Sequence, residues 1–211
     1  MSSETEKGGG DGSEAGHPRA RRADAQRNMD ALLEAALAVF ASSGVDAPVR
    51  EIAEKAGLGV GTVYRHFPHR ADLVAAVFRH EVDACADAAP ELAAEHDPGE
   101  ALALWMQRYA AFIATKRGLA GALHSGHPAY GSLHDYFNER LQPALGALLR
   151  AAAAAGEVRG DIEPDELLGA VASLCMQARD ERPEHARRMV ALLVDGLRYG
   201  AEGAPAGAPP A

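Results

Sequence analysis

The stretch that decides the fold is residues 48–67, PVREIAEKAGLGVGTVYRHF. Its first half repeats apolar residues at helical spacing, which predicts a short helix that begins near Val49 and packs on a neighbour. Gly57 follows this pattern, and glycine readily adopts the positive φ that a sharp turn out of a helix requires. A second helix is expected to begin near Val60 and to end before Pro68. The segment therefore predicts two short helices joined by a tight turn.

Two helices joined steeply by such a turn form a helix-turn-helix motif, whose second helix enters the major groove of DNA. Residues of the second helix that do not face inward have side chains suited to DNA contacts. Thr62 can donate to a phosphate or touch a thymine methyl group, and Arg65 can bind a phosphate or a guanine edge. A solvated surface side chain is the alternative for each. The candidates from this motif are Arg50, Gly61, Thr62, Tyr64, Arg65 and His66.

A longer stretch, from Leu32 to Leu73, resembles the DNA-binding domain of the TetR family of transcriptional regulators. An amphipathic helix ending in VFASSG is followed by REIAEKAGL, by GTVYRHF and by a charged turn before a fourth helix. Two positions depart from the family pattern, because Pro48 and Gly59 replace the usual Thr or Ser. Glycine is a tolerated N-cap and proline suits a first helical turn, so the fold is expected to survive.

This resemblance implies an all-α protein, with an N-terminal three-helix helix-turn-helix domain joined to a larger antiparallel helical domain that binds ligand and dimerises. It implies phosphate contacts for Thr62, Tyr64 and His66, and also for Arg70, where family members usually have Lys. It further implies a repressor that leaves its double-stranded operator DNA when a small-molecule effector binds. No cofactor is expected.

The charge distribution agrees with this division. The formal net charge is −9, yet residues 19–80 carry nine bases and seven acids. Residues 81–211 carry eleven bases and nineteen acids. Only the N-terminal part is therefore positive, as contact with phosphate favours.

Composition breaks divide the chain into four segments. Residues 1–22, rich in Gly, Ser and Glu and then basic, are expected to form a disordered arm, and residues 23–70 the helix-turn-helix domain, with a first helix over Asp24–Ser42. Residues 71–199 are expected to form the ligand-binding and dimerisation domain. Pro90 and residues 95–99 are expected to interrupt its helices, and residues 200–211 are expected to be a disordered tail.

The middle of the chain is rich in aromatic residues with polar tips, which suit a small-molecule pocket and equally suit an ordinary core. The candidate pocket residues are Trp105, Tyr109, Phe112, His124, Tyr130, Tyr136 and Phe137.

The last two expected helices, 165–179 and 183–199, have apolar faces wider than one neighbour requires. Pairing them with a symmetry mate would give a four-helix homodimer interface. The candidate interface residues are Leu168, Val171, Leu174, Cys175, Met189, Leu192 and Leu193.

Other classes receive little support. The chain has no GxSxG, HExxH or P-loop motif, and no enzyme activity is expected. His124, His127 and His134 have irregular spacing for a metal site, so none is predicted. No signal peptide or membrane span is recognised, which predicts a cytoplasmic protein with no membrane partner. The alternative function is a protein-interaction adaptor that keeps the helix-turn-helix shape without specific DNA binding, supported by Gly59 and the acidic remainder.

Overall fold

The computed structural model describes residues 18–116, 119–123, 125–177 and 183–199. Within these ranges the chain is helical and contains no strand, as the sequence predicts for an all-α protein. The elements are α1 Pro18–Ser43, α2 Val49–Lys55, α3 Val60–His66, α4 Arg70–Glu95, α5 Pro98–Lys116, α6 Ala120–Leu123, the 3-10 turn η2 Pro128–Tyr130, α7 Leu133–Ala154, α8 Pro164–Gln177 and α9 Pro183–Tyr199.

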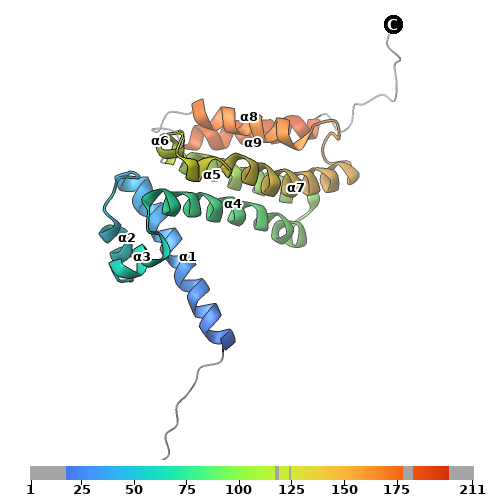
Figure 1. Cartoon of the computed structure of the whole chain (residues 1–211). Helices are drawn as coiled ribbons and strands as arrows, with labels where there is room; N and C mark the ends of the chain where they lie inside the picture. The colour runs from blue at the N-terminus through green and yellow to red at the C-terminus, as the bar shows by residue number, and fades with distance from the viewer. Residues whose placement is uncertain (1–17, 117–118, 124, 178–182, 200–211) are drawn as a thin grey trace, which may run out of the picture.

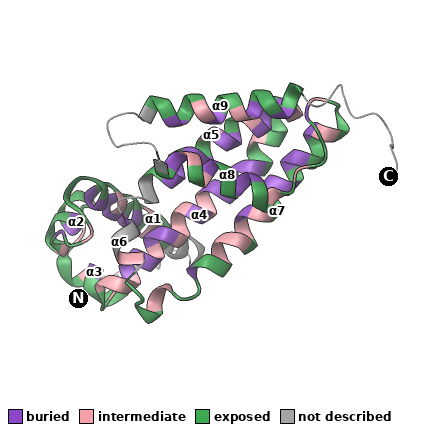
Figure 2. Cartoon of the chain, turned by 90° about the horizontal axis from the view of Figure 1, so that it is seen from above, coloured by how far each residue is buried: buried purple, intermediate pink, exposed green. Residues whose placement is uncertain are grey.

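The helices form two groups that share the long helix α4. Helices α1, α2 and α3 pack together at the N-terminal end of α4, and α5, α7, α8 and α9 form a bundle along the rest of it (Figure 1). One buried apolar cluster joins α1–α3 to Leu73, Val74 and Val77 of α4. A second begins on the same helix at Ala75 and Phe78 and extends through the bundle. In Figure 2 the buried residues of α4 and α7 lie where these helices face their neighbours.

Two helix boundaries differ from the sequence expectation. Helix α1 begins at Pro18, not at Asp24, so the last residues of the expected arm belong to it. Proline is favoured in a first helical turn, and the alanines and arginines that follow it are good helix formers. Residues 1–17 and 200–211, expected to be disordered, lie outside the described residues.

The expected break at Pro90 is wrong, because α4 continues through this residue to Glu95. Pro90 lies on the exposed face of the helix, where its ring meets solvent, while Ala88 and Ala89 beside it are buried in the bundle. Proline removes one backbone hydrogen bond from a helix. Here the buried apolar face on both sides of that position outweighs the loss.

Candidate functional site

The turn between α2 and α3 has the geometry that the sequence predicts. Gly57 has a φ of +67°. Its N–H donates to the Glu54 carbonyl over 3.1 Å, and the Leu58 N–H donates to the Ala53 carbonyl over 2.8 Å. These two bonds form a Schellman motif, in which a left-handed residue closes the end of a helix. Pro48 occupies the N-cap of α2, one position before the first turn in which a proline was expected.

Helix α3 presents one face to its own domain and the other to solvent. Val63 is 1% exposed and packs beside Ile52 of α2, which is fully buried. Tyr64 is 52% exposed. Gly61, Arg65 and His66 are also exposed, and Thr62 is half-buried. The polar face of α3 is therefore free to meet a ligand as large as a DNA duplex, and the apolar face fixes its orientation.

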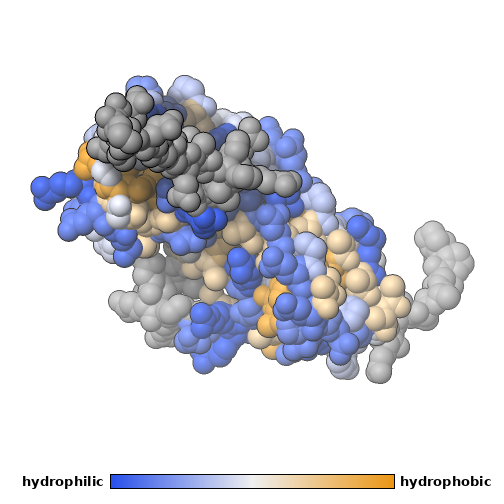
Figure 3. All heavy atoms as spheres, turned by 90° about the horizontal axis from the view of Figure 1, so that it is seen from below, coloured by the Kyte–Doolittle hydropathy of each residue, from blue (hydrophilic) through white to orange (hydrophobic). Residues whose placement is uncertain are grey.

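Two further candidates lie beside α3. Arg50 is exposed near the start of α2. Arg70 is half-buried at the start of α4, and its Nη1 donates to the Val45 carbonyl in the loop before α2. A guanidinium carries five N–H donors, so this bond leaves others for a phosphate. Figure 3 views the molecule from below and shows a largely hydrophilic face with scattered apolar residues.

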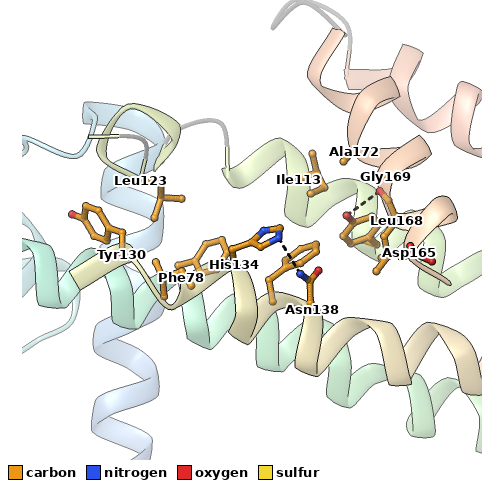
Figure 4. Close-up of a pocket in the computed structure, with 13 residues that line it drawn as sticks. Phe78, Ile113, Leu123, Tyr130, His134, Asn138, Asp165, Leu168, Gly169 and Ala172 are labelled. Carbon is orange, nitrogen blue, oxygen red and sulfur yellow. Dashed lines mark hydrogen bonds between the residues drawn. The ribbon is translucent and has the colours of Figure 1, made fainter. Parts of the chain in front are cut away.

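A cavity of about 470 Å³ lies in the bundle, beside the helix-turn-helix domain. Pockets for drug-sized ligands span roughly 300–1,000 Å³. Its wall comes from α4, α5, α6, η2, α7 and α8 (Figure 4). The lining residues are Phe78, Tyr109, Ile113, Leu123, Tyr130, Leu133, His134, Phe137, Asn138, Asp165, Leu168, Gly169 and Ala172.

Three of the seven aromatic and histidine candidates line this cavity, namely Tyr109, Tyr130 and Phe137. Trp105 does not line it, because its ring is fully buried and its Nε1 donates to the Cys85 carbonyl over 2.9 Å. Phe112 packs behind the wall, with its ring centroid 6.1 Å from that of Phe137. His124 lies outside the described residues.

Tyr136, the remaining candidate, faces α4 and takes part in a polar contact between helices. Its hydroxyl donates to both carboxylate oxygens of Asp83, each over 2.7 Å. Arg140 donates to Asp83 and to Asp87, again over 2.7 Å. Partial burial and the Asp83 carboxylate raise the pKa of Tyr136 above its ordinary value. This contact joins α7 to α4, the helix that carries the helix-turn-helix domain.

Sequence reasoning missed most of the aliphatic wall and the polar residues His134, Asn138 and Asp165. Phe78 lies on an apolar helical face. Every buried helix has such a face, so the pattern does not indicate a cavity. The only signal in the sequence that could indicate this lining was the mixture of polar and apolar residues on one helical face of 133–138. That signal does not identify a cavity until α8 is placed against α7.

The cavity is in direct contact with the helix-turn-helix domain. Leu123 and Tyr130 line the cavity and also pack against the apolar cluster of α1–α4. Leu119, just before α6, is 2% exposed within that cluster. Burial and the nearby Asp72 carboxylate of α4 raise the pKa of the Tyr130 hydroxyl. A ligand that moves either lining residue therefore acts on the packing that holds α3.

Comparison with known proteins places this arrangement in a family. Residues 32–77 match the family of bacterial regulatory proteins, tetR family, and residues 97–199 match the C-terminal domain of SbtR-like transcriptional regulators. The crystal structure of the TetR transcriptional regulator SCO0520 from Streptomyces coelicolor is 41% identical, with a TM-score of 0.72 over 80% of this chain and 97% of that one. The chain belongs to the TetR family.

Two more relatives agree with this assignment. A TetR transcription regulatory protein from Mycobacterium vanbaalenii is 38% identical, with a TM-score of 0.65 over 84% of this chain and 99% of its own. An HTH-type transcriptional regulator from Staphylococcus aureus (strain USA300) is 36% identical over 63 residues, which span 29% of this chain and 34% of that regulator. This chain therefore matches about a third of the curated relative's length. These TetR-family relatives are transcriptional regulators rather than enzymes.

Only some of the candidate dimer-interface residues of this TetR-family protein lie on its surface. Leu168, Val171 and Cys175 are at most 4% exposed and pack in the chain's own core, so the interface prediction is corrected for these three. Leu192 is 64% exposed on α9. Leu174, Met189 and Leu193 are half-buried. Met176, which the sequence analysis did not select, is 53% exposed on α8.

Within the described residues, no group of three or more His, Cys, Asp or Glu is placed to hold a metal ion. None of the described helices is long and apolar enough to span a membrane. Cys85 and Cys175 are buried and are not joined in a disulfide, and burial raises the pKa of Cys85 to about 12.

Proposed function

We propose that this TetR-family regulator is a repressor that binds operator DNA as a homodimer and leaves it when a small molecule fills the cavity between α4 and α8. The observation that carries the proposal is the shared packing of Leu123 and Tyr130. Both residues line the cavity and contact the apolar cluster that fixes α3. Because a ligand shifts an equilibrium only by binding two states differently, this contact is where occupancy would favour one orientation of α3.

The DNA contacts are assigned to the exposed face of α3 and its neighbours. Tyr64 and His66 hydrogen-bond phosphates, Arg65 reaches a phosphate or a guanine edge, and Gly61 allows close approach of the backbone. Arg50, Thr62 and Arg70 add phosphate contacts from the helix starts and from α3. The exposure of these residues, with the buried anchors Ile52 and Val63 beneath them, supports this assignment.

A dimer is required because one short recognition helix buries too little surface for selective binding. The apolar side chains that α8 and α9 leave exposed, Met176 and Leu192, support pairing of these helices with a second copy. Two recognition helices would then meet half-sites about 34–36 Å apart, one turn of the duplex. Binding to chromosomal DNA places this activity in the cytoplasm.

Fluorescence anisotropy with a labelled duplex from the region upstream of the protein's own gene tests the proposal. We expect tight binding that weakens steeply with salt, because phosphate contacts release counterions. Tyr64→Ala is expected to weaken binding about tenfold, or about 1.4 kcal/mol. Tyr199→Ala is the matched control, because Tyr199 is 93% exposed and ends α9, a helix that lies on the other side of α4 from α3 (Figure 1).

The proposal fails if ligand-free protein shows no preference for any duplex in a randomised library. It fails equally if Tyr64→Ala and Tyr199→Ala have the same effect, because DNA would then not be bound by α3. Size-exclusion chromatography with light scattering tests the dimer. A monomer at the concentrations that saturate the operator would contradict that part of the proposal.

A further inference from the structure

The cavity has two chemically different ends. Leu123 and Tyr130 form one end, next to the helix-turn-helix domain (Figure 4). Asp165, Leu168 and Gly169 of α8 form the opposite end. An amphipathic ligand would therefore place its apolar body toward the helix-turn-helix domain and its polar group toward α8.

Asp165 gives the α8 end a negative charge, and the polar groups of His134 and Asn138 lie between the two ends (Figure 4). Asp165 is exposed at the cavity mouth, and its carboxylate has no hydrogen-bond or ion-pair partner among the described side chains. Asn138 donates from Nδ2 to Nε2 of His134 over 3.1 Å, which leaves the Asn138 amide oxygen as an acceptor. The Tyr109 hydroxyl is already used, because it donates to the Leu168 carbonyl over 3.2 Å.

Lys and Arg are absent from this lining as far as the structure describes it, and His134 is the one basic side chain among the lining residues. The thirteen lining residues include one acid, Asp165, and neither Lys nor Arg. A carboxylate or phosphate ligand would lose its hydration here and meet an acidic side chain with no Lys or Arg to pair with, which is unfavourable. A ligand with an ammonium group would gain a counter-ion and donate to the acceptors that the site leaves open.

The wall between the two ends is aromatic. Tyr109 stands at its centre, with ring centroids 6.2 Å from those of Phe112 and Phe137. Phe78 completes the wall from α4, with its centroid 5.9 Å from that of Phe112. Aromatic faces attract cations as well as apolar surface, and this attraction grows when the site is partly dry.

We infer that the effector of this cavity is an amphipathic organic cation, with an aromatic or branched apolar body and an amine that pairs with Asp165. This inference rests on the proposed function only in treating the cavity as the effector site. The volume of about 470 Å³ suits a drug-sized molecule. The apolar body would press on Leu123 and Tyr130.

Three fluorescent probes of one shape test the charge preference, namely pyren-1-ylmethylamine, pyren-1-ylmethanol and pyrene-1-carboxylate. Each is titrated with the full chain in the absence of DNA, and anisotropy gives the Kd. We expect the amine to bind about fivefold to tenfold more tightly than the alcohol, as a solvent-accessible ion pair with a cation–π contribution allows. The carboxylate is expected to bind most weakly.

The matched variants are Asp165→Asn and Glu166→Gln. Both remove one acid from the first turn of α8, but Glu166 does not line the cavity. The protein's net charge of −9 attracts any cation, so only the contrast between the variants isolates the site. Asp165→Asn should remove most of the amine's advantage over the alcohol and leave the alcohol unchanged. Glu166→Gln should change neither by more than about twofold, the scale of an exposed charge pair.

Two results would overturn the inference. One is a carboxylate that binds as tightly as the amine. The other is an equal loss of amine affinity in both variants, which would mean that the cation responds to overall charge. Because these titrations contain no DNA, failure of a bound amine to release the operator would count against the proposed function and not against the ligand class.

Discussion

The helix-turn-helix domain and the helical bundle differ in where their candidate functional residues lie. In the first, apolar anchors such as Ile52 and Val63 are buried and the polar residues of α3 face outward. In the second, the candidate ligand-binding residues face inward and line a cavity. The wall of this cavity comes from segments that are distant in the sequence. The first region presents polar side chains to its surroundings, and the second encloses a cavity inside the bundle.

This difference explains how much of each region the sequence predicts. Residues 48–67 contain their own helices, turn and exposed face, so local spacing was enough to predict α2, the positive φ of Gly57 and α3. The cavity depends on how α8 lies against α7. Helical periodicity shows that an apolar face is buried, but it does not distinguish a residue that fills the core from one that borders a void.

Trp105 illustrates the limit in the bundle. A large aromatic residue with a polar tip suits a pocket, yet its N–H is satisfied by the Cys85 carbonyl and its ring is fully buried. Asp165, an ordinary acid in a first helical turn by sequence, lies at the cavity mouth. Pro90 shows a related limit, because tertiary packing of α4 overrides a local helix-breaking signal.

The largest expected effect is the destabilisation of the helix-turn-helix domain without destabilisation of the bundle. Ile52→Ala removes a fully buried side chain from the small core under α3 and should cost about 2–5 kcal/mol. Operator binding should be lost. The chain's one tryptophan, Trp105, is buried in the bundle, so its fluorescence reports unfolding of that region alone.

Urea unfolding followed by far-UV circular dichroism and by tryptophan fluorescence measures this effect. In Ile52→Ala, helix should be lost in an early step while the tryptophan transition stays near that of the wild type. Val60→Ala is the control, because Val60 is 37% exposed on the same domain. A tryptophan transition that moves with the circular dichroism would mean that α4 couples the regions into one unfolding unit.

A smaller effect concerns the polar contact between α4 and α7. Tyr136→Phe removes the hydrogen bonds to Asp83 and should cost about 1 kcal/mol at neutral pH, as for a partly exposed bond to a charged group. The pKa of Tyr136 is raised in the folded state, first by desolvation and then by Asp83. Its stabilising effect is therefore complete below about pH 10, the unfolded pKa, and is lost as pH rises through the folded pKa.

Urea unfolding of the wild type and of Tyr136→Phe, from neutral to alkaline pH, measures how the effect of this hydrogen bond on the free energy of unfolding changes with pH. The difference in the free energy of unfolding between wild type and Tyr136→Phe should shrink as pH rises above about 10. Tyr199→Phe, which alters an exposed tyrosine, should show no such trend. A difference that stays constant or grows with pH would contradict the role given to the Asp83 contact.

The smallest expected effect restores a side chain that the family usually has. Gly59 is the N-cap of α3, with φ of −72°, a conformation open to any residue. A Cβ there would meet only the Thr62 hydroxyl oxygen at 3.8 Å, an ordinary contact. Gly59→Ser should raise the free energy of unfolding by a few tenths of a kcal/mol. It should also tighten operator binding through a new phosphate donor. Thermal unfolding and anisotropy measure both, and weaker DNA binding would contradict this placement of Gly59.

The central claim, that α3 lies against DNA, is tested most directly by Gly61→Ala. A Cβ at this exposed helical position meets no atom within 4 Å beyond its chain neighbours and the backbone of its own helix, and alanine should stabilise the helix by about 0.5–1 kcal/mol. Thermal unfolding and operator anisotropy are measured on the same sample. We predict a higher Tm together with affinity reduced about tenfold, or about 1.4 kcal/mol, because the added methyl occupies space needed by DNA. A more stable variant that binds the operator with unchanged affinity would contradict the claim.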